Sequence, residues 1–398
     1  MSNEKLAIDG GTPVRARLLP YGRQTIDDRD VAAVVETLRS DWLTTGPKVA
    51  EFERALAAVA GTTEAVAVST GTAALHAAMY ALGIGPGDEV IVTTMTFAAS
   101  ANAAAFLGAT PVFVDVNPDN LLIDPRQVEA HVTPRTKAVV AVDYAGHPCD
   151  YDALETIAKQ QGLALVDDAC HAIGGSYRRR PVGSLALLNA FSFHPVKHVA
   201  TGEGGAITTN DPELARRMRL FRNHGITSDF RERAAQGAFA YEMVDLGFNY
   251  RLSDIQCALG ITQLAKLPAS IARRQAIARQ YDEAFGQSLY VKPLAVCPDV
   301  SHAYHLYVIC LELASLTADR AAVFRALRAE GIGVNVHYMP VHLHPYYQNK
   351  FGTRPGMCPV AEAAYERLLS LPMFPAMTDE DVGDVVQAVE KVCGAYAK

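Results

Sequence analysis

Short apolar runs alternate with segments of helical periodicity through the first half of the chain. Runs of Val, Ala, Leu and Ile predict buried strands, and apolar positions recurring every three to four residues predict helices between them. The predicted strands cover residues 65–70, 89–94, 111–116, 137–144 and 163–169. The predicted helices cover residues 28–39, 47–61, 72–83, 98–108 and 151–162. This alternation indicates an α/β fold with a mostly parallel sheet between helices.

Local signals bound the first two predicted helices. Thr25 and Asp28 have the spacing of a capping box before the helix at 28–39. Pro47 suits the first turn of the next helix, and Gly61 suits its end.

The pattern changes after residue 252. A long, mostly helical stretch runs from residue 253 to 286, and we expect an interruption near Pro268. Residues 302–311 alternate like a half-exposed strand. A helix at 317–331, a strand at 333–338 and a helix at 378–392 follow. We therefore expect an N-terminal arm at 1–20, a large domain at 21–252, and the long helix with a smaller α+β domain at 253–398.

Charge and cysteine content narrow the function classes. The 398 residues include 36 Lys plus Arg and 43 Asp plus Glu, a formal net charge of −7, which argues against a nucleic-acid partner. The longest basic run, Arg178–Arg180, predicts a solvated turn. Seven cysteines without CxxC spacing favour reduced thiols in a cytosol over disulfides or a zinc site. The first 15 residues lack a signal-peptide core, and no apolar run could span a bilayer, so we expect a cytoplasmic protein without a membrane partner.

Candidate chemistry lies just after the predicted strands, where parallel sheets bind ligands. Residues 69–72, Ser-Thr-Gly-Thr, come directly before a helix, and its free N–H groups with the adjacent hydroxyls suit a phosphate. An ordinary helix cap is the alternative, and neither the P-loop nor the GxGxxG pattern is present. Phe97 follows the strand at 89–94, where it could stack on a planar ring or simply fill the core.

Two further strand ends carry ionisable groups. Asp167, Asp168 and His171 suit a metal site, a helix cap, or an acid facing a heteroaromatic nitrogen. Lys197 follows an apolar run and precedes a Gly-rich turn, TGEGG, which suits an inward-facing lysine. A desolvated lysine amine is a nucleophile that can form a Schiff base with an aldehyde cofactor.

Taken together, these motifs resemble the DegT/DnrJ/EryC1/StrS family of pyridoxal-phosphate-dependent nucleotide-sugar aminotransferases. The resemblance runs along almost the whole chain, through STGTAALHAA, TTMTFAASANA, VDDACHAIGG, FSFHPVKHVATGEGG, LGFNYRLSDIQCALG and HYMPVHLHPYYQ. It implies the fold-type-I transferase architecture, pyridoxal 5'-phosphate (PLP) as cofactor, and a homodimer with active sites at the subunit interface. The segment VDDACHA departs slightly from the family's EDAAHA-like pattern but keeps its Asp and His.

The resemblance also implies residue roles. Lys197 resembles the Schiff-base lysine, Asp168 the acid facing the ring nitrogen, and His171 the neighbour of the ring hydroxyl. The other implied cofactor contacts are Phe97 (stacking), Gly71, Thr72 and Ser192 (phosphate), and Asn249 (phosphate of the partner subunit). Arg251 would meet a substrate carboxylate or a nucleotide phosphate. The remaining candidates for substrate contact are Tyr21, Thr44, His305, His337 and Tyr338; no metal is implied.

The implied reaction is a ping-pong transfer of the amino group of L-glutamate to a nucleotide-linked keto sugar. The sequence motifs most resemble those of the pseudaminic-acid branch, whose enzymes aminate C4 of UDP-2-acetamido-2,6-dideoxy-β-L-arabino-hexos-4-ulose. Other nucleotide-linked 4-keto sugars, from 4-amino-4-deoxyarabinose, perosamine or antibiotic pathways, remain alternatives. A sugar dehydratase of the same fold is disfavoured because such relatives carry His where this chain has Lys197. A non-catalytic regulator is disfavoured by the negative charge and the complete cofactor set.

Overall fold

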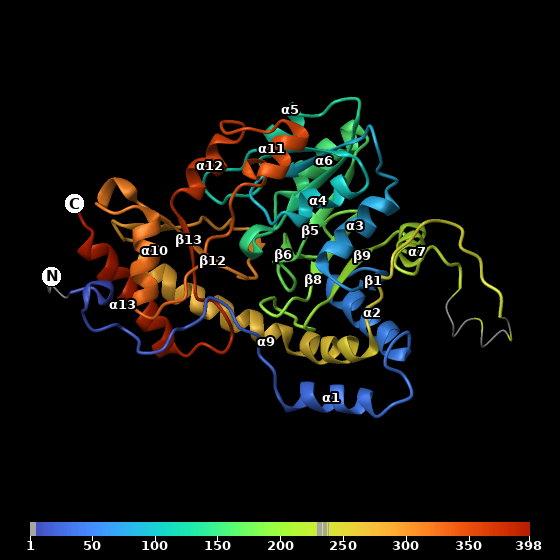
Figure 1. The fold of residues 1–398 in the computed structure, drawn as a ribbon, viewed down its shortest axis with the longest axis horizontal. Helices are drawn as coiled ribbons and strands as arrows, with labels where there is room; N and C mark the ends of the chain where they lie inside the picture. Colours follow the sequence, from blue (N-terminus) through green and yellow to red (C-terminus); the bar gives the residue numbers. More distant parts are fainter. Residues whose placement is uncertain (1–4, 229–232, 234–236, 238) are drawn as a thin grey trace.

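The computed structural model describes residues 5–228, 233, 237 and 239–398 (Figure 1). The predicted arm at 1–20 and the predicted domain at 21–252 each include some residues outside these ranges. The strands are β1 Glu64–Val68, β2 Glu89–Thr93, β3 Thr110–Val114, β4 Thr136–Val142, β5 Ala164–Asp168, β6 Ser176–Tyr177, β7 Arg180–Pro181, β8 Leu188–Ser192, β9 Gly205–Thr209, β10 Val291–Pro293, β11 Val300–Ser301, β12 Tyr307–Leu311 and β13 Leu368–Leu371.

Helices account for most of the remaining regular structure. The α-helices are α1 Asp28–Leu38, α2 Pro47–Ala60, α3 Gly71–Ala81, α4 Ala99–Phe106, α5 Pro125–Ala130, α6 Tyr151–Gln161, α7 Pro212–Phe221, α9 Asp254–Phe285, α10 Arg320–Ala329, α11 Pro345–Phe351, α12 Pro359–Tyr365 and α13 Asp379–Ala395. Short 3-10 turns are η1 Ala7–Asp9, η2 Tyr144–Gly146, η3 Leu313–Ser315 and η4 Val341–Leu343. No helix in the described ranges is both long and apolar enough to cross a membrane.

A seven-stranded sheet forms the centre of the larger part of the chain. Its strand order is β1-β9-β8-β5-β4-β2-β3, and β9 runs antiparallel to its neighbours while the other strands are parallel. The predicted mostly parallel α/β sheet is therefore confirmed. Its parallel strands bring their carboxyl ends to one edge, where a ligand crevice is expected.

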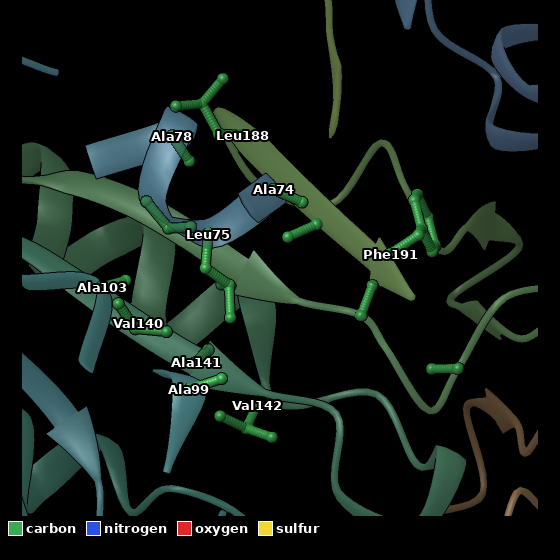
Figure 2. Packing of buried hydrophobic residues seen from close by; sticks show 14 of the residues in the cluster. Ala74, Leu75, Ala78, Ala99, Ala103, Val140, Ala141, Val142, Leu188 and Phe191 are labelled. Carbon is green, nitrogen blue, oxygen red and sulfur yellow. The ribbon is translucent and has the colours of Figure 1, made fainter. Parts of the chain in front are cut away.

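Small side chains let helices approach this sheet closely. Figure 2 shows Ala74 and Ala78 of α3 beside Leu188 of β8, within one buried cluster. Ala99 and Ala103 of α4 lie beside the Val140–Val142 end of β4 in the same cluster. This packing fixes the first turn of α3 over the carboxyl end of the sheet, because interiors packed at crystal-like density leave little room to shift.

The C-terminal part of the chain has a second buried core. It is built from β10, β12 and β13, which form an antiparallel three-stranded sheet in the order β10-β12-β13, and from α10 and α13. Helix α9 joins the two cores: Leu264, Leu267 and Ile271 pack in the first, and Tyr281 and Phe285 pack in the second. Figure 1 shows α9 below the sheet and above α1, reaching from the sheet to the smaller part.

Three predictions about these elements were wrong. The cap of α1 is Asp27 paired with Asp30, not Thr25 with Asp28, because the Asp27 carboxylate accepts from the first-turn N–H groups. Helix α9 continues unbroken through Pro268, because contacts with both cores outweigh one lost hydrogen bond. Residues 333–338 form no strand; an isolated bridge joins Asn335 to Ser370.

The predicted strand at 302–311 is shorter and more buried than its alternation indicated. Only Tyr307–Leu311 forms β12, and all five residues are buried between β10 and β13 and beneath the helices. Alternation misled because the polar side of this strand is covered by neighbouring elements.

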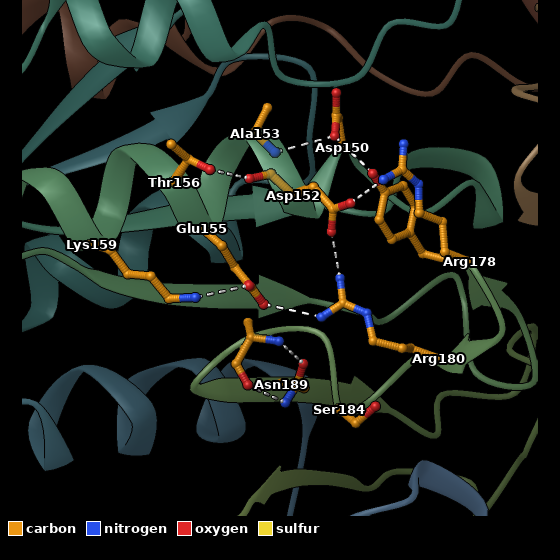
Figure 3. A network of polar contacts seen from close by, with 12 residues as sticks. Asp150, Asp152, Ala153, Glu155, Thr156, Lys159, Arg178, Arg180, Ser184 and Asn189 are labelled. Carbon is orange, nitrogen blue, oxygen red and sulfur yellow. Dashed lines mark hydrogen bonds and ion pairs between the residues drawn. The ribbon is translucent and has the colours of Figure 1, made fainter.

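The Arg178–Arg180 run forms a turn, as predicted, between β6 and β7. Arg178 and Arg179 adopt positive φ angles of 48° and 65°. Two of the three side chains reach back to α6: Arg178 pairs with Asp152, and Arg180 pairs with Asp152 at 2.9 Å and with Glu155 at 3.2 Å (Figure 3). These partly exposed pairs join the hairpin to α6.

Candidate active site

A cavity of about 510 Å³ opens at the carboxyl edge of the central sheet. Residues at or just after the ends of the neighbouring parallel strands line it. Strands β5 and β8 end at the lining residues Asp168 and Ser192, and strands β1 and β2 end a few residues before Gly71 and Phe97. The full lining is Tyr21, Thr70, Gly71, Thr72, Leu75, Thr96, Phe97, Ala99, Val142, Asp168, Cys170, His171, Ser192, His194, Val196, Lys197, Glu203, His305, His337 and Tyr338. Parallel strand topology therefore assembles side chains that are far apart in sequence.

The N-terminus of α3 forms one wall. Thr70 caps the helix, its hydroxyl accepting from the Ala73 N–H at 3.0 Å. Gly71 is the first helical residue, and a Cβ atom added there would lie 2.7 Å from the Ser192 Cβ. The backbone consequently comes very close to β8, and the free N–H groups of this first turn lie beside a hydroxyl at the cavity wall. Such an arrangement suits a phosphate.

A buried carboxylate and an exposed aromatic ring lie on two further walls. Asp168 is 6% exposed; its Oδ2 accepts from Ser100 Oγ at 2.6 Å and its Oδ1 from the Cys170 N–H at 3.3 Å. These donors hold the carboxylate in one orientation. Phe97 is 60% exposed although it follows a fully buried strand, so its ring is available to a planar ligand.

Lys197 brings an amine into the same cavity. The residue as a whole is half-buried, but its amine lies among closely packed groups, and this burial lowers the pKa of Lys197 against the opposing effects of Cys170 and Asp168. Its Nζ lies 3.5 Å from His305 Nε2. Burial also holds the pKa of His305 well below its ordinary value, with the Lys197 charge acting in the same direction. His305 is therefore neutral at physiological pH and adds no positive charge to the site.

Residues from both ends of the chain close the cavity. Tyr338 lies with its hydroxyl 3.2 Å from His171 Nε2, and the two rings are stacked at 25°. His171 Nδ1 is buried and has no hydrogen-bond partner in the described part of the chain. Tyr21 and His337 lie with ring centroids 5.3 Å apart. The cavity is therefore closed by residues from the start of the chain and from its C-terminal part.

Most of the candidate residues come together here. The cavity is lined by Lys197, Gly71, Thr72, Phe97, Asp168, His171, Ser192, Tyr21, His305, His337 and Tyr338. Three others lie outside it in this chain. Thr44 bridges to Ser253, Asn249 is exposed and bridges to Asn223, and Arg251 donates to Asn223 Oδ1 at 2.8 Å.

Ser100, His194 and Glu203 also lie at this site, although no sequence motif had marked them. Ser100 lies one helical turn after Thr96, whose hydroxyl is 2.7 Å from Ser100 Oγ. Its signal was its place in the segment TTMTFAASANA, but nothing in the sequence alone shows that it faces Asp168. His194 and Glu203 lie in the loop on either side of Lys197, and both line the cavity.

The sequence model of the DegT/DnrJ/EryC1/StrS aminotransferase family matches residues 24–390. The chain belongs to this family. It is 44% identical over 380 residues to the spore coat polysaccharide biosynthesis protein SpsC of Bacillus subtilis, covering 95% of this chain and 98% of that protein.

Solved structures of sugar aminotransferases share its fold closely. The putative sugar aminotransferase Spr1654 from Streptococcus pneumoniae, in its PMP form, has a TM-score of 0.90 and 34% identity, over 95% of this chain and 99% of that one. PseC from Helicobacter pylori, an aminotransferase involved in pseudaminic acid biosynthesis, has a TM-score of 0.89 and 34% identity, over 96% and 100% of the chains. The chain is thus a sugar aminotransferase with the fold-type-I architecture, and the predicted family and fold are confirmed.

The cofactor of this family, PLP, is also that of the present chain, and Spr1654 has been solved in a PLP form. The cavity fits it on three counts. The start of α3 approaches β8 too closely at Gly71 for any side chain, leaving backbone N–H groups for a phosphate. Phe97 presents a bare ring, and Asp168 and Lys197 supply the acid and amine that pyridoxal enzymes use.

Proposed function

We propose that this chain transfers the amino group of L-glutamate to C4 of a nucleotide-linked 4-keto-6-deoxy sugar by a ping-pong mechanism. The preferred substrate is UDP-2-acetamido-2,6-dideoxy-β-L-arabino-hexos-4-ulose. The observation that carries the proposal is the Lys197 amine, with its lowered pKa, in one cavity with the buried Asp168 carboxylate. A lysine rather than a histidine at this position favours amination over dehydration.

Each cavity wall has a task in holding the cofactor. The first-turn N–H groups of Gly71 and Thr72, with the Ser192 hydroxyl, would bind the phosphate. Phe97 would cover the ring, and Asp168 would hold the proton on the ring nitrogen. Bound PLP supplies an electron-withdrawing ring that accepts the electron pair released when the donor's Cα loses its proton.

Lys197 performs the proton movements. Because burial lowers its pKa, a larger fraction of its amine is neutral than for an exposed lysine. Nζ can therefore accept the proton from Cα of the donor and later deliver a proton to C4 of the sugar. His305 beside it is neutral, so it adds no positive charge next to the amine, and its Nε2 can accept a hydrogen bond from Nζ.

Support for the sugar comes from PseC, whose described role lies in pseudaminic acid biosynthesis. SpsC is described by a role in spore coat polysaccharide biosynthesis, which keeps other nucleotide-linked 4-keto sugars as the second candidates. The deciding experiment incubates the PLP-loaded protein with L-glutamate and a panel of UDP- and dTDP-linked 4-keto sugars. Mass spectrometry and NMR then identify the aminated product. Exclusive amination of a dTDP-linked sugar would replace the proposed substrate.

We further propose that two copies of the chain complete each other's sites. Asn249 is exposed and lies outside its own cavity, and the segment leading to it exposes apolar side chains. Those side chains are Phe239, Tyr241, Met243, Val244, Leu246 and Phe248. An apolar surface of this kind marks a protein contact, and a second copy would cover it while presenting Asn249 to the partner's cofactor phosphate.

Mixing an inactive variant with one that binds PLP weakly tests this arrangement. Lys197→Ala removes the amine, and Asn249→Ala should weaken PLP binding about 10- to 100-fold by removing one donor to a charged group. If Asn249 acts across the interface, one site of a mixed dimer carries both defects and the other carries neither. Activity at limiting PLP should therefore partly return. Subunit exchange without any recovery would contradict the shared site.

A further inference from the structure

A second hollow, of about 470 Å³, adjoins the cavity at Lys197. It lies between the segment before α1, the middle of α9 and the loop at Pro375. Its lining is Arg23, Thr25, Arg29, Lys197, His198, Gln263, Ala265, Lys266, Ala269, Ser270, Arg273, Arg274 and Pro375. Six of these residues are lysine or arginine and none is acidic, so the hollow is strongly electropositive.

Neighbouring carboxylates neutralise only part of this charge. Three of the cations have acidic partners outside the lining. The pairs are Arg29 with Asp27, Lys266 with Asp27 and Asp30, and Arg273 with Asp379. Arg23 is exposed and has no ion pair or hydrogen bond among the described residues.

Arg274 is the most unusual member of the hollow. It is 1% exposed, and its Nη1 donates only to neutral backbone carbonyls, those of Tyr304 and Met373 at 2.9 Å and that of His305 at 3.4 Å. Its Nε is buried and finds no hydrogen-bond partner within the described ranges. Burial without a counter-ion lowers the pKa of Arg274 to about 9. A buried cation without an anion is costly, and a bound anion would offset that cost.

We propose that this hollow binds a diphosphate group. Guanidinium groups match phosphate oxygens in a fork geometry, and Arg23 and Arg274 are the two arginines of this hollow that have no carboxylate partner among the described residues. The favoured source is the diphosphate of the nucleotide-linked sugar, an assignment that rests on the proposed function. Because Lys197 lines both the cavity and the hollow, one ligand can reach the amine with its sugar and the arginines with its diphosphate.

Another arginine-rich hollow, beside α7, is the rival site. It is about 370 Å³ and includes Arg219, Arg222 and Arg251, but it shares no residue with the cavity. Arg222 pairs with Glu53, which also lines that hollow. Its charge is therefore partly balanced within the site itself, unlike that of the Arg23–Arg274 hollow.

The test measures binding of UDP and of inorganic pyrophosphate to the PLP-loaded protein by calorimetry. Arg23→Gln should weaken both about three- to tenfold, and Arg274→Gln about tenfold or more, because each removes a charge-assisted donor. Arg39→Gln, at the exposed far end of α1, removes the same charge and should leave both affinities unchanged. If Arg274→Gln does not fold, Arg23→Gln still decides, because Arg23 is exposed and has no hydrogen bond or ion pair among the described residues whose loss could unfold the protein.

Unchanged affinities in Arg23→Gln, or a loss confined to Arg251→Gln, would overturn the proposal. Inhibition kinetics with UDP then separate the two sources. Competition with the keto sugar assigns the diphosphate to the substrate, and non-competitive inhibition assigns it to a free nucleotide. Failure of every keto sugar in the panel, with arginine-dependent UDP binding retained, would refute the proposed reaction and leave this site standing.

Discussion

Replacing Gly71 by alanine should damage the phosphate wall of the cavity. An added Cβ would lie 2.7 Å from Ser192 Cβ and 3.2 Å from Ser192 Oγ. Carbon atoms in contact prefer 3.5–4.0 Å, so α3 and β8 must separate by about 1 Å. Both elements are packed into the buried core, which resists that movement.

The expected magnitude follows from overpacking. Forcing one extra carbon into a well-packed site costs about 1–3 kcal/mol. Alanine is a better helix former than glycine by up to about 1 kcal/mol, so the intrinsic preference of the backbone acts in the opposite direction. We expect a net loss of about 1–2 kcal/mol in the free energy of unfolding of the apoprotein. The same displacement at the phosphate site should raise the Kd for PLP about tenfold.

The assay combines urea unfolding of the apoprotein with PLP titration. Gly85→Ala is the matched control, because a Cβ there has no neighbour within 4 Å and its φ is not positive. It should be neutral or stabilising. Ser192→Gly removes the Cβ that Gly71→Ala would strike, so the two changes together should cost less in unfolding free energy than their sum. Strict additivity, or a Gly71→Ala protein as stable as Gly85→Ala, would refute the packing argument.

Three other predictions concern buried polar groups. Ser100→Ala should lower kcat about tenfold with little change in folding, because the Asp168 carboxylate loses its 2.6 Å donor. The control Ser184→Ala, which removes a hydroxyl that donates to a backbone carbonyl, should leave kcat unchanged; equal kcat values for the two variants would contradict the positioning role of Ser100. Asp254→Ala should lower the free energy of unfolding, measured in urea, by about 2–4 kcal/mol. The buried Asp254 carboxylate accepts from two backbone N–H groups at the start of α2, at 2.7 and 2.9 Å, and a loss below about 1 kcal/mol would count against a stabilising role for these bonds. Burial lowers the pKa of His337 to about 4, so between pH 6.5 and 4 only the unfolded chain takes up a proton at this residue. The free energy of unfolding should therefore fall by up to about 3 kcal/mol as the pH drops through this range. His337→Gln should reduce this pH dependence of stability, and an unchanged dependence would refute the assignment to His337.

The sequence was most informative where one local pattern decides the structure. Continuous apolar runs predicted the strands β1 to β5 to within two residues at each end, because strands buried on both faces tolerate few polar residues. Residues directly after those strands formed the cavity, because parallel topology alone brings them to one edge. Lys197 and Asp168 met there for that reason.

Competing local signals and long-range contacts explain what was missed. Thr25 and Asp27 each have an acidic residue three positions later, Asp28 and Asp30. Only the fold selects the Asp27 box, since Asp30 also binds Thr262 and Gln263 of α9. Pro268 predicted a break that tertiary packing overrides. Thr44, Asn249 and Arg251 lie outside the cavity of their own chain, and the role proposed for Asn249 requires a second copy, which one chain's pattern does not describe.

The shared helix α9 also determines how the molecule can deform. Because α9 packs into both cores, the cores cannot move relative to one another without bending this helix. Pro268 supplies no N–H to the Leu264 carbonyl, so α9 bends most easily near that turn. His337 lines the cavity and its Nδ1 lies 2.8 Å from Ser370 Oγ of β13, whereas Lys197 follows the central sheet. Bending of α9 near Pro268 would therefore shift His337 relative to Lys197 and change the width of the cavity.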